Sequence, residues 1–345
     1  MSNNTPVPNA EVKINNTLLP FSEIESAQID EEINTPAMCV IKISNIDTEK
    51  GNWKYMESKI LNLGDEITIS MGIDAIQPVF SGEIVAIDFE FSENLSTISI
   101  RGYDRLHRLQ LEDKTRTFTE IKDSDLAQKI AGDWGLSNQV ESTQTVYPYL
   151  CQNNQHDLEF LLQRAKRIRY ELGVDDKKLF FRKSKENSGS VASLEYKVHF
   201  SNFSPTLSTV YRGSKVKVQG WDVKNKAVIS GQSSSGQKVS QMGAKSAGDS
   251  LTKKAFKKSS TTIVGENIID ATEAKTIAGA QYNASLIETV EGEGHCMGNP
   301  VIRIGKTIEL LGIGRLSGVY YVFSTTHRID DSGYTTSFGV RRTGI

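Results

Sequence analysis

The sequence predicts an α+β protein that is mainly β, with two small antiparallel β-barrels joined by an α+β insertion. Apolar residues recur with a period of two near both ends of the chain, and they change to helical spacing between these regions. The length of 345 residues also exceeds what a single core usually fills. We therefore expect a first barrel at residues 1–110, the insertion at 111–200 and a second barrel at 201–345.

The clearest strand of the N-terminal region spans residues 82–91. Its alternate positions predict one apolar face, formed by Val85, Ile87, Phe89 and Phe91. The turn residues Ser92-Glu93-Asn94 lead into a second strand at 97–103, so the two strands are expected to form an antiparallel hairpin. Similar strands are expected at 11–15, 37–44 and 65–71, and closure of such strands into a barrel removes their free edges.

Helical spacing marks the insertion. A short helix is expected to begin at the capping residues Asp123-Ser124 and to end near Gly135. A longer helix begins at Asn154 or His156, and its apolar stripe consists of Leu158, Leu161, Leu162, Ala165 and Ile168. Residues 170–174 and 179–182 flank a polar turn and predict a further hairpin.

The C-terminal region opens with a Ser/Gly/Lys-rich segment at about 230–262. Its composition predicts a mobile connection, and the alternative is a segment that orders against an acidic partner surface. Asp270 or Thr272 is expected to cap a helix that extends to about Leu286. Strands are expected again at 307–311, 319–326 and 334–340, separated by glycine-rich turns.

Composition excludes several classes of function. Forty basic and 42 acidic residues give a net charge of −2, so no overall field favours nucleic acid or a membrane surface. No signal peptide and no apolar run of about 20 residues is present, and we expect synthesis and assembly in the cytoplasm. The thiols of Cys39, Cys151 and Cys296 have neither disulfide-framework nor zinc-ligand spacing, which indicates ordinary cysteines in a reducing compartment.

No catalytic motif accompanies these features. The chain has no nucleophile elbow, no HExxH pair and no phosphate-binding loop, so we expect no enzyme, cofactor or metal. Two carboxylate pairs, Glu291 with Glu293 and Asp175 with Asp176, lie in predicted turns. A glycosidase needs two carboxylates across a sugar, so a cell-wall glycan hydrolase stays open as an alternative.

Three stretches together resemble a known family. They are Arg101-Gly-Tyr-Asp-Arg-Leu-His-Arg108, Asn153 to Leu162, and the C-terminal region from Gly298 to Thr336. In this order and spacing they are similar to the late-control D proteins of contractile-tailed phages and to the N-terminal hub half of the type VI secretion spike VgrG. The matching positions are Arg101, Gly102, Tyr103, Asp104, Asp157, Leu158, Phe160, Gly298, Asn299, Pro300, Gly305, Gly312, Ser317, Gly318, Tyr320, Val322, His327, Gly333 and Tyr334.

The resemblance implies a baseplate central hub. Such a subunit is expected to form a homotrimer around an axial channel, in which six similar barrels adapt a hexameric tail tube to a trimeric spike. The implied partners are a spike protein, tube or tube-initiator proteins and other baseplate proteins, and the destination is a phage-tail-like particle. Because the chain ends at Ile345 without the needle of VgrG-type spikes, we expect a separate spike protein. A free-standing β-rich ligand-binding module is the other alternative.

Overall fold

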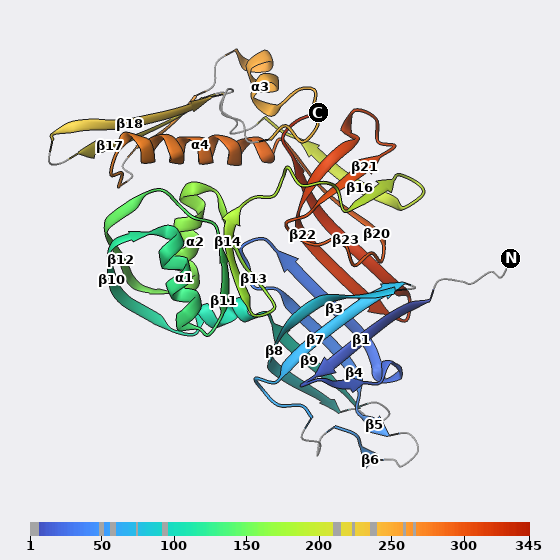
Figure 1. The fold of residues 1–345 in the computed structure, drawn as a ribbon. Coiled ribbons are helices and arrows are strands. Elements are labelled where there is room, and N and C mark those ends of the chain that lie inside the picture. Colours follow the sequence, from blue (N-terminus) through green and yellow to red (C-terminus); the bar gives the residue numbers. More distant parts are fainter. Residues whose placement is uncertain are drawn as a thin grey trace.

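The structure is a computed structural model that describes residues 7–47, 52–55, 60–73, 75–91, 96–209, 215–222, 225–234, 240–257, 260–264 and 267–345. Strands form most of these residues and helices are few, which confirms an α+β, mainly β protein. The elements lie in three bodies: a long sheet, a compact α+β part and a smaller arm beside it (Figure 1).

A 13-stranded sheet joins the two ends of the chain. Its N-terminal strands are β1 (Pro8–Ile14), β2 (Thr17–Leu19), β3 (Ile24–Glu32), β4 (Met38–Ser44), β7 (Glu66–Ile73), β8 (Ala75–Phe91) and β9 (Ser96–Tyr103). Its C-terminal strands are β15 (Ala192–Glu195), β16 (Phe200–Leu207), β20 (Val290–Met297), β21 (Thr307–Leu311), β22 (Gly318–Asp330) and β23 (Gly333–Arg342). The halves meet where β3 pairs with β22 in antiparallel register, with Ile29 opposite His327.

The expectation of two closed barrels is not confirmed. The sheet follows the path β16-β20-β23-β22-β3-β4-β9-β8-β7-β1-β2, and no pairing among the described strands closes it. Because β3 and β22 pair with each other, the backbone N–H and C=O groups at one edge of each half form hydrogen bonds with the other half. The halves nevertheless bury separate apolar clusters, one around Ile41 and Ile69 and the other around Ile308 and Val340.

The hairpin of β8 and β9 forms as expected, with Ile87 opposite Ile100. Its turn, Ser92-Glu93-Asn94, lies outside the described residues. The predicted apolar face is only partly buried: Phe89 and Phe91 are about half exposed, at 46% and 55%. The register of β8 against β9 also shifts between Ile84 and Ala86. Nearby, β5 (Ile46–Asp47) pairs with β6 (Asn52–Trp53).

The middle part has its own core. It contains β10 (Asp113–Lys122), α1 (Asp123–Asp133), β11 (Ser137–Val140), β12 (Val146–His156), α2 (Asp157–Ile168), β13 (Tyr170–Asp175) and β14 (Lys178–Lys183). The predicted stripe of α2 is confirmed in Leu158, Leu161 and Ala165, which are buried. The 3-10 helix η2 (Arg105–Gln110) connects β9 to this core and contributes Leu106 and Leu109.

Helix capping agrees with the sequence in one case and departs from it in another. His156 caps α2, since its Nδ1 accepts a hydrogen bond from the Glu159 N–H at 3.0 Å. Asp123 was expected to cap α1 but is its first helical residue, and Lys122 occupies the cap position without a side-chain bond. The Asp123 carboxylate binds Arg164 at 2.6 Å instead, because an ion pair within the core satisfies it better than the helix end does.

The C-terminal region contains a unit that the sequence did not predict. The strands β17 (Lys215–Asp222), β18 (Ala227–Ser234) and β19 (Thr261–Val264) form a sheet against α4 (Ala271–Ile287), which Asp270 caps as expected. The segment at 230–262 was expected to be a mobile connection. Its described residues instead include the end of β18, the helix α3 (Gly248–Phe256) and part of β19, while residues 235–239 and 258–259 lie outside the described residues.

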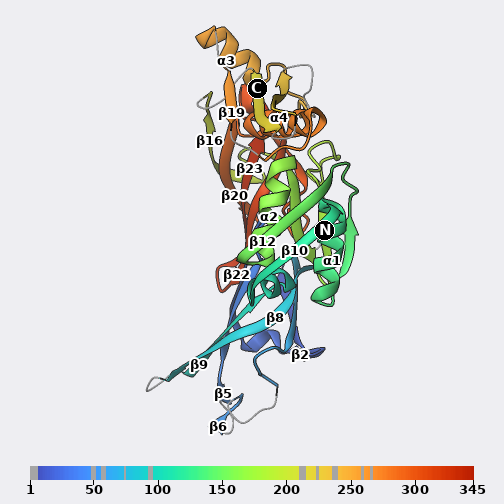
Figure 2. The same cartoon turned by 90° about the vertical axis from the view of Figure 1, so that its left-hand side faces the viewer.

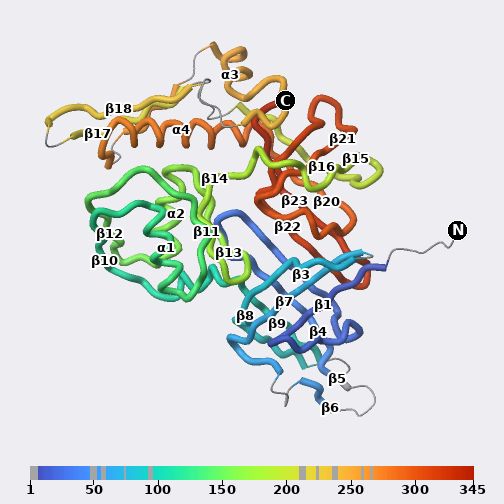
Figure 3. Tube along the Cα trace, in the orientation of Figure 1, coloured from blue at the N-terminus to red at the C-terminus, as the bar shows by residue number. Residues whose placement is uncertain are grey.

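This unit forms an arm above the middle part (Figure 1), and the molecule is narrow and elongated when seen from the side (Figure 2). The C-terminus returns to the base of the arm near α3 (Figure 3). The Ser246 N–H donates to the Ile345 carbonyl at 2.6 Å and fixes the last residues there. Two further 3-10 turns, η1 (Phe21–Glu23) and η4 (Gly314–Leu316), complete the described elements.

Candidate functional site: an ion-pair junction and two signature clusters

The first signature stretch forms the end of β9 and the start of η2. Asp104 caps η2, because its carboxylate accepts hydrogen bonds from the Leu106 and Ala37 N–H groups, each at 3.0 Å. Burial raises the pKa of Asp104 to about 7, although these two hydrogen bonds act in the opposite direction. Gly102 is required beside it, since an added Cβ would lie 2.9 Å from the Cys39 sulfur and 3.1 Å from the Glu83 carbonyl oxygen.

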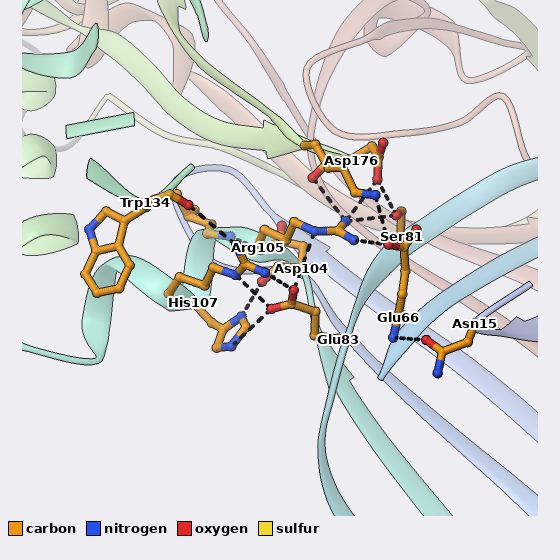
Figure 4. A network of polar contacts seen from close by, with 12 residues as sticks. Asn15, Glu66, Ser81, Glu83, Asp104, Arg105, His107, Trp134 and Asp176 are labelled. Carbon is orange, nitrogen blue, oxygen red and sulfur yellow. Dashed lines mark hydrogen bonds and ion pairs between the residues drawn. The ribbon is translucent and has the colours of Figure 1, made fainter. Parts of the chain in front are cut away.

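Arg105 is the centre of an ion-pair junction (Figure 4). Its side chain is 3% exposed and reaches Glu66 at 2.9 Å, Asp176 at 2.9 Å and Glu83 at 3.6 Å. Glu66 and Glu83 belong to the long sheet, whereas Asp176 lies in the β13–β14 turn of the middle part. The five-donor guanidinium is suited to this branched arrangement, and it connects the two bodies.

A second basic residue completes the junction. Arg108 binds Glu83, with its Nε 2.9 Å from the carboxylate. Burial alone would raise the pKa of Glu83, but hydrogen bonding to Arg108 and the charges of Arg108 and Arg105 lower it. His107 Nδ1 lies 2.6 Å from the Asp104 carbonyl oxygen (Figure 4). Arg101 points away from this group, since it is exposed on β9 and pairs with Asp88 at 3.3 Å.

The second signature stretch organises the middle part around Asp157. This buried carboxylate accepts hydrogen bonds from Lys114 and Gln152 at 2.9 Å and from the Trp134 indole at 2.8 Å, and it pairs with Arg116 at 2.5 Å. Burial alone would raise the pKa of Asp157, yet these donors lower it. Leu158 and Phe160 follow in the apolar core, so the stretch fixes the start of α2.

The third stretch gathers around His327. Its Nδ1 lies 2.9 Å from the Tyr334 hydroxyl and 3.1 Å from Thr336 Oγ1, and its Nε2 lies 3.0 Å from the Ile302 carbonyl oxygen. Burial lowers the pKa of His327 to about 4. Asn299 belongs to the same cluster, because its N–H donates to Thr336 Oγ1 at 2.9 Å. Pro300 follows it in the chain.

The other signature positions of this stretch shape turns and strand ends. Gly305, Gly312, Gly318 and Gly333 have positive φ angles of 73°, 76°, 142° and 117°. Ser317 Oγ accepts from the Ile313 N–H at 3.0 Å, and the Tyr320 hydroxyl donates to the Leu316 carbonyl at 2.6 Å. Val322 is buried in the C-terminal core. The signature residues therefore lie in separate clusters and do not line one pocket.

Sequence reasoning missed the acidic partners of these clusters. Glu31 on β3 is 7% exposed and accepts from Arg303 Nε and Nη2 at 2.5 and 2.6 Å and from Thr325 Oγ1 at 3.0 Å. This contact joins the two halves of the sheet beside the His327 cluster. Glu31, Glu66 and Glu83 have no local motif, because their partners lie far away in the sequence.

The carboxylate pair considered for glycan hydrolysis is placed differently than expected. Glu291 and Glu293 lie on strand β20 and not in a loop. Gly292 between them and Gly294 after them are strand residues over which aromatic rings lie, and added Cβ atoms would approach Phe203 at 2.9 Å and Phe338 at 2.8 Å. Glu291 is 3.5 Å from Arg341. The other pair lies at the β13–β14 turn, as predicted.

The remaining candidate groups are as follows. Cys39 and Cys296 are buried free thiols whose pKa burial raises to about 12, and Cys151 is exposed. Within the described ranges, no group of three His, Cys, Asp or Glu side chains could hold a metal ion. No helix in the described part of the chain is long and apolar enough to cross a membrane. The site thus consists of charged and polar contacts that hold the middle part against the long sheet and the two halves of the sheet against each other.

The comparisons with known proteins agree on the fold. A 43 kDa tail protein of prophage MuSo2 from Shewanella oneidensis superposes with a TM-score of 0.71 at 14% identity, covering 97% of this chain and 98% of that one. A tail protein from Neisseria meningitidis gives 0.68 at 14% identity, with 98% of both chains covered. An E. coli component of the type VI secretion system, described as similar to the T4 phage tail proteins gp27 and gp5, gives 0.59 at 11% identity over 96% of this chain and 76% of that one.

The sequence comparisons add the family. A search of the curated proteins finds no match. A family model described as the Alg8 N-terminal domain matches residues 4–331, which is most of the chain. The fold is therefore that of phage tail and type VI secretion proteins, and the chain belongs to the Alg8 N-terminal domain family.

Proposed function

We propose that this protein is a structural subunit of a phage-tail-like particle, namely the central hub of its baseplate. The observation that carries the proposal is the similarity of fold to two tail proteins, one of them from a prophage, along 97% and 98% of the chain, with almost all of each tail protein covered. The proposed subunit is a homotrimer that adapts the tail tube to a separate spike protein. It is assembled in the cytoplasm, acts without catalysis, and requires no cofactor.

The long sheet supports a hub around a channel. One of its faces is polar across the β3–β22 junction, where paired neighbours run from Glu293 through Gly339 and Ser324 to Glu32. The next row runs from His295 through Ser337 and Thr326 to Asp30. A polar sheet face that carries hydroxyl, carboxylate and imidazole side chains suits the wall of a water-filled channel, while the opposite face carries both cores.

The junctions support a rigid adapter. Arg105 connects the sheet to the middle part, and Arg303 with Glu31 connects the two halves of the sheet. A ring that bears load between a tube and a spike requires subunits that do not flex at these boundaries. Closed rings form by repeated association of identical surfaces, and such assembly needs no reaction centre.

The test is light scattering coupled to size-exclusion chromatography on the full chain, alone and with the candidate spike protein encoded beside it. We expect a trimer, or a complex of three hub chains with three spike chains. A chain that stays monomeric in both samples would refute the hub and favour the free-standing ligand-binding module. Clearing of a peptidoglycan suspension, lost in Glu291→Gln, would instead favour the hydrolase.

A further inference from the structure

A wide groove separates the middle part from the arm. It has a volume of about 1370 Å³ and is bounded by β12 and α2 on one side and by β17, β18, β19, the residues just before α4 and the middle of α4 on the other. This side of the molecule faces the viewer in Figure 2, where α2 and β12 lie below α4. We call it the α2–β17 groove.

The walls of the α2–β17 groove expose large apolar side chains. Trp221 and Val228, which are opposite each other on β17 and β18, are 57% and 59% exposed. Val264 on β19 is 71% exposed, and Tyr149 on β12 is 59% exposed. Single exposed apolar residues are ordinary, but a group that lines one concavity is typical of an interaction surface.

The charged residues among the described lining of the groove have one sign. Of the residues that the structure describes there, Arg164, Lys166 and Arg167 from α2 are basic and none is acidic. Arg164 pairs with Asp123 and Arg167 pairs with Glu273, and these two acids are buried and are not among the lining residues. Lys166 is exposed and forms no ion pair with any other described residue. An occupant that carried negative charge would therefore be attracted to the α2 wall.

Size and chemistry together identify the class of occupant. The volume exceeds the roughly 300–1,000 Å³ of ordinary small-molecule pockets. The exposed apolar residues of the walls favour an occupant with apolar side chains, and the basic residues of α2 favour one with carboxylates. We propose that the α2–β17 groove docks a segment of another protein in which apolar side chains are flanked by Asp or Glu. The proposal does not rest on the hub role, since it uses only this surface.

The test uses the full chain and a fluorescein-labelled peptide of about 15 residues, with Leu on one helical face and Glu beside it, which provides about four helical turns. Fluorescence polarisation measures its binding at low salt. A second peptide has Gln in place of every Glu. We expect the Glu peptide to bind and the Gln peptide to bind about tenfold more weakly or worse, because one lost charge contact commonly costs that much.

Matched variants locate the binding. Lys166→Glu and Trp221→Ser lie in the groove, whereas Lys178→Glu and Trp53→Ser change an exposed lysine and an exposed tryptophan outside it. All four positions are exposed, so folding should be retained, and circular dichroism checks it. We expect each groove variant to weaken binding of the Glu peptide about tenfold and each control to leave it within about twofold.

Three results would overturn the proposal. The first is that neither peptide binds, and the second is that the groove variants and the controls weaken binding equally. The third is that Lys166→Glu or Trp221→Ser changes the oligomeric state of the chain while the wild type ignores the Glu peptide. That last result would assign the groove to a second copy of the chain. A hub that fails to trimerise would leave the peptide experiment unaffected, so the two proposals fail separately.

Discussion

Arg105 shows how one residue determines the position of two bodies. It is buried, and its carboxylate partners come from β7, β8 and the β13–β14 turn. We predict that Arg105→Ala lowers the free energy of unfolding by about 2–3 kcal/mol, because charge-assisted bonds are lost around a buried site. The loss stays below that of a fully buried pair, since Glu66 and Asp176 are partly exposed and regain water. Urea unfolding followed by circular dichroism measures it.

The matched control for Arg105 is Arg328→Ala. Arg328 pairs with Asp330 at 2.7 Å, but its side chain is 56% exposed. Exposed pairs contribute about 0–1 kcal/mol, so this variant should change stability little. Equal effects of the two substitutions would show that the junction contributes no more than an ordinary surface pair.

Asp104 should make stability depend on pH. Its pKa is raised from 3.8 to about 7 by burial, so between these values the folded protein binds more protons than the unfolded chain. Stability from this group is therefore present at low pH and is lost as the pH rises from about 4 to 7, at up to about 1.4 kcal/mol per pH unit. We predict that wild type loses stability relative to Asp104→Asn between about pH 5 and pH 8.

His327 acts in the opposite direction. Burial lowers its pKa from 6.5 to about 4, so the stability that it contributes is lost as the pH falls through this window. Because both proteins retain His327, the difference between wild type and Asp104→Asn reports Asp104. The asparagine can replace only one of the two accepting oxygens, and that cost is the same at every pH. A difference in unfolding free energy that is equal at both pH values would contradict the raised pKa.

At the scale of elements, Gly298 holds the loop after β20 against β23. Its N–H donates to the Tyr334 carbonyl at 2.8 Å, and an added Cβ would lie 2.0 Å from the Tyr334 ring. We predict that Gly298→Ala destabilises the protein by about 1–3 kcal/mol, as overpacking in a closed site does. The displaced ring should also lose its contact with His327, which histidine NMR signals would report.

Gly132→Ala is the matched control for Gly298. Gly132 lies within α1, and an added Cβ there would meet nothing within 4 Å. Alanine leaves the unfolded chain with less conformational entropy than glycine does, so less entropy is lost when the helix forms. The free energy of unfolding of Gly132→Ala should therefore rise by about 0.5–1 kcal/mol. Opposite signs for the two substitutions test the packing argument. A stable Gly298→Ala with an unchanged His327 signal would refute it.

Elements with a strong local pattern were predictable from the sequence. The stripe of α2, its His156 cap and the β13–β14 hairpin are determined by neighbouring residues. The strand at Glu291 to His295 was not predictable, because its two glycines indicate a loop until Phe203 and Phe338 are seen to pack over them. The same holds for the arm, where Val216 and Val218 are buried only because α4 covers them.

The candidate site was predictable only in part. The signature stretches located Asp104, Asp157 and His327, whose clusters are built around buried polar groups. Their partners could not be inferred from spacing, since Asp176 lies 71 residues from Arg105 and Glu31 lies 272 residues from Arg303. The pairing of β3 with β22 could not be inferred either, because these strands lie at opposite ends of the chain. Without that pairing, closure of each half into its own barrel was the reasonable expectation.

At the scale of the whole molecule, the halves of the sheet are joined by strand pairing and, among the described residues, by the ion pair of Glu31 and Arg303. Burial alone would lower the pKa of Arg303, but the neighbouring Glu31 carboxylate raises it. We predict that Arg303→Ala costs about 3–5 kcal/mol, because it leaves the Glu31 carboxylate buried without its main partner. Glu31→Ala should cost less, since the Arg303 side chain is 29% exposed and can reach water.

The double-mutant cycle decides whether this pair couples the halves. If Glu31 and Arg303 stabilise the junction through each other, the double variant should be destabilised by about 2–3 kcal/mol less than the sum of the single variants. The pair Glu291 and Arg341, 3.5 Å apart within one half, contains a carboxylate that is 48% exposed, so it should give a coupling below about 1 kcal/mol. Additive effects at Glu31 and Arg303 would mean that strand pairing alone joins the halves. The rigidity required of a hub would then rest on the backbone ladder between β3 and β22.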